Sequence, residues 1–247
     1  MKKKLILSSL CLILLLIMML STTLAWFTDS KANINTMVAG KIGIEQTETD
    51  KDGNPFVGSN FTMLPNVEIV KKVTVENIGN QPCYVRTLFA FEDATYTDEN
   101  GVERSVAEML TTKTPDGVDI DIPTGANKVQ FTVNKDGKTT TYTVGYYVHQ
   151  SQLPNEENNS IPILESITLK GEADNNWQKA VGDDYELIVL SQASQVSGLD
   201  NLGNDGNESP EAALNTAFNT ITGEWCATWF AKVLGGTATG NVITVNP

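Results

Sequence analysis

Histidine is almost absent from this chain, because His149 is the only one among 247 residues. A zinc peptidase of the His-Glu-x-x-His type needs two imidazoles one helical turn apart, and no such pair exists here. For serine or cysteine catalysis, His149 would be the only imidazole base, and no nucleophile motif surrounds Ser151, Cys83 or Cys226. We therefore predict a protein that is not an enzyme, with no catalytic, cofactor-binding or metal-binding residues.

Cysteine is also scarce, with three residues in the chain. Cys11 lies inside an apolar N-terminal run, so only Cys83 and Cys226 belong to the rest of the protein. This number excludes a small disulfide-rich scaffold. Two alternatives remain: one disulfide between Cys83 and Cys226, worth about 4–5 kcal/mol in the chain-entropy description, or two buried free thiols.

Basic residues are few compared with acidic ones, 17 against 30. The surface is therefore expected to repel nucleic acid and anionic lipid. Calcium is a weak alternative, because Asp50-Lys51-Asp52-Gly53-Asn54 and the segment 201–208 hold oxygen ligands near glycines. Neither segment matches the twelve-residue calcium loop, and a hairpin turn and a solvated loop explain them without a metal.

Only one long apolar run is present, at residues 5–20, after Met1 and three lysines and before a small-residue exit. This arrangement is typical of a secretory signal peptide. We predict a signal at residues 1–25, with cleavage between Ala25 and Trp26 and only transient contact with the membrane. Removal of its lysines brings the net charge from −13 to near −16. The alternative is an uncleaved anchor, since residues 5–27 approach the ~20 residues that a membrane span needs.

The rest of the chain is dominated by alternation of apolar and polar residues, which indicates half-buried strands. The hairpin signal is clearest at Asn134-Lys135-Asp136-Gly137-Lys138, because Asp-Gly favours a tight turn. Strands are predicted over residues 67–75, 85–91, 129–133, 142–148, 161–169, 185–196 and 242–245. These many short strands predict an all-β protein with minor α content, an antiparallel β-sandwich of jelly-roll type with one or two short helices.

Helix is predicted at two places. Residues 102–110 have room for two turns, and Ser209-Pro210-Glu211 provides an N-cap, a first-turn proline and a first-turn acid. We expect one jelly-roll-like domain at residues 26–200 and a C-terminal extension at residues 201–247 that packs on it. The aromatic residues of this extension either pack in a core or form a binding patch: Trp225, Trp229 and Phe230.

The segment that cleavage would free also has strand character, with Val38, Ile42 and Ile44 on one parity. Within and before it stand Leu24-Ala25-Trp26-Phe27-Thr28-Asp29, Ala32-Asn33, Val38-Ala39-Gly40 and Ile42-Gly43-Ile44. This block resembles the start of TasA/camelysin-type proteins, and the similarity continues in the run 73–80, which ends in Asn-Ile-Gly-Asn, and in Tyr84-Val85-Arg86. The resemblance covers about residues 1–200.

The resemblance implies a secreted protein of Gram-positive type, located in the extracellular biofilm matrix or on the cell surface, with its signal removed by a SipW-type signal peptidase. Relatives polymerise by pairing the freed N-terminal segment of one subunit into the sheet of the next. The expected partner is thus another copy of this chain or a homologous matrix protein. The assembly strand would contain Asn33, Val38, Gly40, Ile42 and Ile44.

Three alternatives remain open. Residues 33–44 pair within their own subunit, or the protein is a monomeric surface module that binds a glycan or a protein. The third and most remote is a metallopeptidase, the class given to camelysin-like relatives.

Overall fold

The protein was examined in a computed structural model that describes residues 28–31, 42–58, 62–117, 119–120, 122–182, 184–196 and 209–246. The predicted cleavage site at Ala25 and Trp26 lies outside these residues, as do Asn33, Val38, Gly40 and the candidate calcium segment 201–208. Strands dominate the described part, with three short α-helices. In that part no helix is long and apolar enough to cross a membrane.

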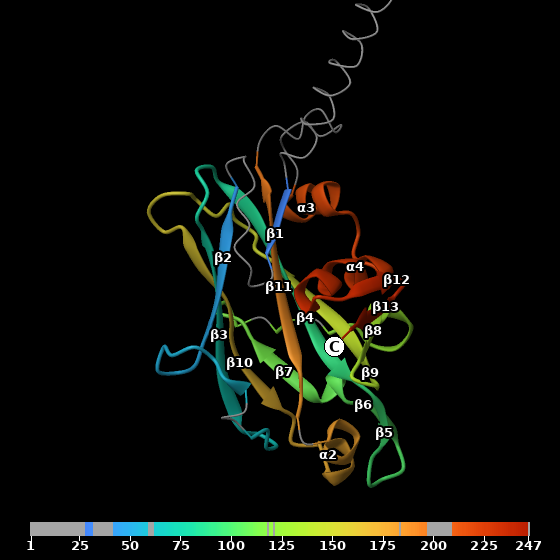
Figure 1. Ribbon diagram of the computed structural model, residues 1–247. Coiled ribbons are helices and arrows are strands. Elements are labelled where there is room, and N and C mark those ends of the chain that lie inside the picture. The colour runs from blue at the N-terminus through green and yellow to red at the C-terminus, as the bar shows by residue number, and fades with distance from the viewer. Residues whose placement is uncertain are drawn as a thin grey trace, which may run out of the picture.

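Two sheets face each other (Figure 1). The larger, sheet A, has the order β1 (Thr28–Lys31), β11 (Leu187–Gln195), β4 (Cys83–Asp93), β9 (Lys138–Val148), β8 (Gln130–Lys135), β13 (Val242–Val245) and β12 (Thr237–Thr239). The smaller, sheet B, has the order β2 (Ile44–Thr49), β3 (Glu68–Asn77), β10 (Ser160–Leu169) and β7 (Leu110–Lys113). A separate hairpin joins β5 (Thr95–Thr97) to β6 (Glu103–Ser105).

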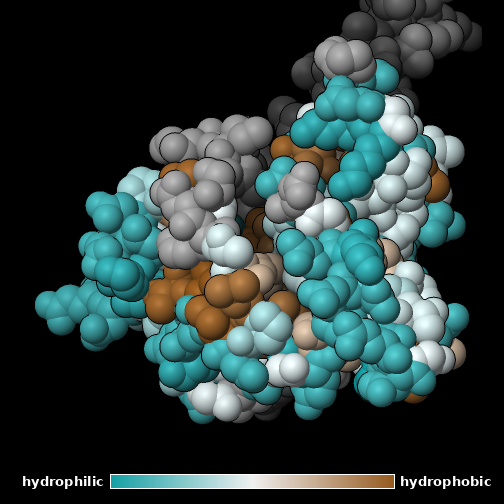
Figure 2. All heavy atoms as spheres, turned by 90° about the horizontal axis from the view of Figure 1, so that it is seen from below, coloured by the Kyte–Doolittle hydropathy of each residue, from teal (hydrophilic) through white to brown (hydrophobic). Residues whose placement is uncertain are grey.

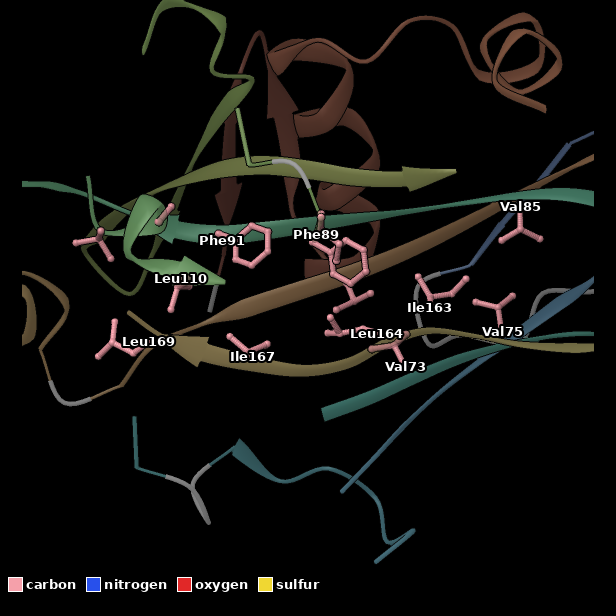
Figure 3. Packing of buried hydrophobic residues seen from close by; sticks show 14 of the residues in the cluster. Val73, Val75, Val85, Phe89, Phe91, Leu110, Ile163, Leu164, Ile167 and Leu169 are labelled. Carbon is pink, nitrogen blue, oxygen red and sulfur yellow. The ribbon is translucent and has the colours of Figure 1, made fainter. Parts of the chain in front are cut away.

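The main core fills the space between the sheets, as Figure 3 shows for side chains that point toward one another from β3, β4 and β10. The alternation in the sequence supplies these residues, because every second side chain of a strand lies on the same face. The members that carry this pattern are fully or almost fully buried: Val73, Val75, Val85, Phe89, Phe91, Ile163 and Ile167.

A second core lies on the opposite face of sheet A. The helices α3 (Pro210–Phe218) and α4 (Gly223–Leu234) cover this face (Figure 1). Leu88 and Ala90 of β4 are buried beneath α4 together with Phe230 and Ile243. Because cores cover both of its faces, β4 is buried at every position except Tyr84, which is half-buried. The C-terminal residues therefore form a third layer and also contribute β12 and β13 to sheet A.

Most predicted elements agree with the structure. The seven predicted strands correspond to β3, β4, β8, β9, β10, β11 and β13. The hairpin between β8 and β9 turns at Asp136 and Gly137, whose φ angles of 51° and 77° fit the expected tight turn. Ser209 caps α3 by accepting a hydrogen bond from the amide of Ala212.

The predicted helix at residues 102–110 is wrong. This segment forms β6, a single 3₁₀ turn at η3 (Ala107–Met109) and the start of β7. Asp98 accepts hydrogen bonds from the amides of Asn100 and Val102, and this closes the β5–β6 hairpin. The apolar residues with helix-like spacing are instead buried in the main core: Val106, Met109 and Leu110.

Two further features differ from the prediction. Sheet A is mixed rather than purely antiparallel, because β13 runs parallel to β8. The chain reaches this position from α4 and the β12–β13 hairpin, so no direct turn from β8 imposes an antiparallel direction. Two helices were not predicted: α4 and α2 (Asn175–Val181), which Asp174 caps through the amides of Asn176 and Trp177.

Candidate functional site: the N-terminal edge of the sandwich

The described N-terminal residues form a short edge strand. β1 pairs antiparallel with β11, with Thr28 opposite Ser194 and Lys31 opposite Ser191. β4 occupies the other side of β11 along its full length. Among the described strands, none lies beside Leu187–Leu190 on the β1 side. Of the strands that the structure describes, β1 alone pairs with this edge of β11, and it does so over four residues.

The next segment is anchored within its own chain. Ile44 begins β2 and is opposite Asn77 of β3, and Ile42 and Ile44 are buried in the main core with 8% and 0% of their surfaces exposed. Of the five residues predicted for an assembly strand, Ile44 pairs within its own chain and Ile42 is buried in the same core.

The edges of the two sheets meet at this site. Gln46 of β2 accepts a hydrogen bond from the Ser191 hydroxyl at 2.7 Å, and its amide nitrogen lies 3.4 Å from the carbonyl oxygen of Val189. These contacts connect sheet B to β11 beside β1. Sequence analysis missed Gln46 and Ser191, because isolated polar residues on a strand carry no signal of their partner.

A buried cluster connects β11 to the helical layer. Gln192 lies opposite Ser30 in the β1–β11 register and accepts a hydrogen bond from Nε of Arg86 at 2.8 Å. Arg86 also donates to Asn215 Oδ1 at 2.9 Å, and only 1% of its surface is exposed. Burial lowers the pKa of Arg86 to about 10. The Gln192 side-chain nitrogen is buried without a hydrogen-bond partner in the described part.

The aromatic residues of the C-terminal layer complete this cluster. The guanidinium of Arg86 lies 4.9 Å from the Trp225 ring centroid, and Trp229 meets Phe218 edge-on at 5.6 Å. Trp225 and Trp229 are half-buried and Phe230 is fully buried. Because they fill the space between helices and sheet, their geometry favours core packing over an exposed binding patch.

Cys83 and Cys226 are both free thiols in the structure. Cys83 belongs to the core between the sheets and Cys226 to the core beneath α4, so they lie on opposite faces of sheet A. Burial raises the pKa of each thiol to about 12. The structure therefore has the arrangement of two buried thiols rather than the disulfide.

In the candidate calcium turn, the Asp50 carboxylate binds backbone amides of the turn itself. Asp50 Oδ1 accepts from the amides of Asp52 and Asn54, each at 2.9 Å. This contact closes the turn, as expected for a hairpin. Within the described ranges, no group of three or more His, Cys, Asp or Glu side chains is placed to hold a metal ion. His149 is half-buried, and burial lowers its pKa.

Comparisons with protein-family models, with curated proteins and with solved structures found no match for this chain.

Proposed function

We propose that this protein is a secreted structural subunit of an extracellular fibre or matrix, and that it assembles by donating its N-terminal strand to the next copy. The observation that supports this most directly is the position of β1, a four-residue strand on the open edge of β11. An edge strand can be replaced by an equivalent strand from another molecule, because main-chain hydrogen bonds provide the pairing.

The exchange would cost little free energy. β1 is held through the pairing of four residues, and each main-chain hydrogen bond contributes only about 0.5–1.5 kcal/mol net. The same pairs form again when β1 of a second copy occupies the same register. The difference between the two arrangements then depends on protein concentration and on the connection that leads into β1.

That connection is long enough to reach a neighbour. Residues 32–41 join β1 to the anchored Ile42, and ten extended residues span about 33–36 Å. In this proposal β1 changes partner, while the sandwich from Ile42 onward keeps its own pairings. Donation from each copy to the next is head-to-tail, which produces an open filament when the rotation does not close a ring.

Other features agree with this proposal. The two facing sheets fit the jelly-roll type of sandwich that the resemblance to TasA/camelysin-type proteins implies, with the parallel β13 and the helical layer as additions. The apolar run at residues 5–20 supports export, and the net charge near −16 of the mature chain keeps free subunits soluble.

A pair of cysteines tests strand donation directly. Thr28 and Ser194 are opposite each other, so the double variant Thr28→Cys/Ser194→Cys places two thiols within reach of a disulfide. Protein beginning at Trp26 is oxidised either as dilute monomer or after it has been concentrated. We expect the first sample to contain locked monomers. When these monomers are then concentrated, they should form no filaments in negative-stain micrographs until reductant is added. The second should contain disulfide-linked multimers on a non-reducing gel.

Three controls accompany this experiment. The single variant Thr28→Cys should assemble once concentrated, whether it is oxidised before or after concentration, and it should form no covalent multimers. Protein lacking residues 26–35 should not assemble. Unaltered protein that stays monomeric at all pH values and calcium concentrations would refute the fibre function and leave the monomeric binding module. Tightly bound stoichiometric zinc in the purified protein would instead revive the metallopeptidase alternative.

A further inference from the structure

A second site lies at the opposite end of β4 from Cys83, around the buried carboxylate of Asp93. Only 6% of the Asp93 surface is exposed. Its Oδ1 atom accepts from the Ser105 hydroxyl at 2.6 Å and the Ala107 amide at 3.2 Å. Its Oδ2 atom accepts from Thr143 Oγ1 at 2.6 Å, Lys128 Nζ at 2.9 Å and Gln130 Nε2 at 3.2 Å. The site forms part of the wall of an open polar hollow of about 460 Å³.

Lys128 and a second acid complete the site. Lys128 Nζ lies 3.4 Å from Glu108 Oε1 as well as 2.9 Å from Asp93 Oδ2. The side chains of Lys128 and Asp93 are only 16% and 3% exposed, and that of Glu108 is 30% exposed. An amine at this distance from a carboxyl oxygen lies about 3.5 Å from the carboxyl carbon, which is the range from which two held groups react.

We propose that Lys128 and Asp93 are the site of an intramolecular amide bond, which forms in the folded protein with Glu108 as the proton carrier. In this reaction Nζ of Lys128 attacks Cγ of Asp93, and the bond from Cγ to Oδ2 breaks. The ammonium group carries three protons: one stays on the amide nitrogen, and two leave with Oδ2 as water. The charges of the ion pair cancel, so neither an oxidant nor an external proton is required.

The surrounding donors suit the intermediate of this reaction. When the amine adds to Cγ, negative charge develops on Oδ1, where the Ala107 amide and the Ser105 hydroxyl already point. Glu108 Oε1 is placed to take a proton from Nζ and to return it to the departing Oδ2. Each step thus has a donor or acceptor from this chain.

The protonation of Asp93 and Lys128 before the reaction limits its rate. Burial acts to raise the pKa of Asp93, but the hydrogen bonds from Ser105, Thr143, Lys128 and Ala107 outweigh burial and lower the pKa below its ordinary value. Freshly folded protein therefore holds an ion pair, and a proton must pass from the amine to the carboxylate before the amine attacks. Bond formation is consequently slow compared with folding and accumulates as the protein matures.

The bond would fasten a segment that has little regular structure. Asp93 and Lys128 are 35 positions apart. Of the residues between them that the structure describes, the regular elements are β5, β6, β7 and two 3₁₀ turns, η3 and η4 (Gly125–Asn127). A covalent connection across this segment would resist pulling and proteolysis, both of which a protein outside the cell encounters.

Mass spectrometry tests the proposal on the protein that begins at Trp26. After prolonged incubation of folded protein, we expect the intact mass to be lower than the sequence mass by one water molecule. Trypsin should no longer cleave after Lys128, and the digest should contain a branched peptide that joins Lys128 to Asp93. The variant Lys128→Arg keeps the charge pair but cannot form the bond, so it should keep its full mass. Glu108→Gln should form the bond much more slowly than the unaltered protein.

One side reaction has the same mass change and must be separated. Succinimide formation at Asp-Gly sequences, such as Asp116-Gly117, also loses one water, but it gives no branched peptide and occurs equally in Lys128→Arg. Full mass and normal tryptic cleavage after Lys128 in incubated protein would overturn the proposal. Equal rates in Glu108→Gln and the unaltered protein would overturn the role of Glu108. These measurements are made on monomers, so their outcome is independent of whether the protein forms fibres.

Discussion

The helical layer is expected to be part of one cooperative fold, and Phe230→Ala tests this expectation. Phe230 is fully buried in α4, and its ring lies 4.9 Å from that of Phe131 in β8. Phe131 in turn stacks on Tyr142 of β9 at 5.3 Å. The substitution removes both the burial of the ring and the aromatic contact, and it leaves a cavity between helix and sheet.

The magnitude follows from that environment. Removing a buried phenylalanine side chain costs about 3–5 kcal/mol, and a domain of ordinary stability unfolds with about 5–15 kcal/mol. We therefore expect the free energy of unfolding to fall by about 4 kcal/mol. Urea denaturation followed by circular dichroism and by tryptophan fluorescence measures this change, and the two transitions should coincide.

Hydrogen exchange locates the effect. Because β4 is shared by both cores, loosening α4 should also reduce the protection of amides in β10, which lies in the other sheet. The control Thr228→Ala alters an exposed position of the same helix and should change stability by less than about 0.5 kcal/mol. If Phe230→Ala lowered the free energy of unfolding by less than about 1 kcal/mol, or left the protection of β10 unchanged, the single cooperative fold would be refuted. The helices would then be an independent appendage.

Three further predictions concern stability in acid, the close approach of α4 to β8 and the reactivity of the thiols. In freshly folded protein, before any amide bond to Lys128 forms, the lowered pKa of Asp93 stabilises the fold above the unfolded value near 3.8, and this contribution is lost as the pH falls through the folded value. Asp93→Asn should therefore lower Tm at neutral pH and flatten the acid side of a Tm–pH curve recorded on fresh protein, and an unchanged curve would contradict the assignment. Gly223→Ala would place a Cβ atom 2.3 Å from the carbonyl oxygen of Gln130, so Tm should drop by several degrees, and a neutral result would exclude this close approach of α4 to β8. Cys83 and Cys226 should resist a thiol reagent in the native protein and both react in denaturant without reductant, whereas a disulfide would leave no reactive thiol in denatured protein beginning at Trp26.

The contacts that Arg86 makes with β11 and with the helical layer show why site prediction from sequence was incomplete. In the sequence Arg86 stands out only as part of the Tyr84-Val85-Arg86 run, whereas the structure buries it beside Gln192 and Trp225. Its partners are more than a hundred positions away along the chain, and no local pattern connects them. The cluster around Asp93 was also missed, because two separate segments, one with Ser105 and Glu108 and one with Lys128, come together at one carboxylate without a local pattern that connects them.

Some missed elements did leave a local signal. α4 begins after Thr222, which caps it through the amide of Trp225, and ends at Gly235 in the left-handed conformation. Between these residues, Cys226, Ala227, Phe230 and Ala231 recur with helical spacing and are buried. The helix was therefore available to sequence analysis, whereas the mistaken helix at residues 102–110 had similar apolar spacing without such caps.

The sequence alone determined seven of the strands, the Asp136-Gly137 turn and the start of α3, because alternation, turn residues and capping residues act over a few neighbouring positions. The short strands β5, β6, β7 and β12 were not predicted. Only the tertiary structure decided that β13 runs parallel to β8, that β4 has a core on each face, and that β1 pairs with β11. These features depend on contacts between distant segments. Alternation indicates which side of a strand is apolar, but it does not indicate which segment packs against that side.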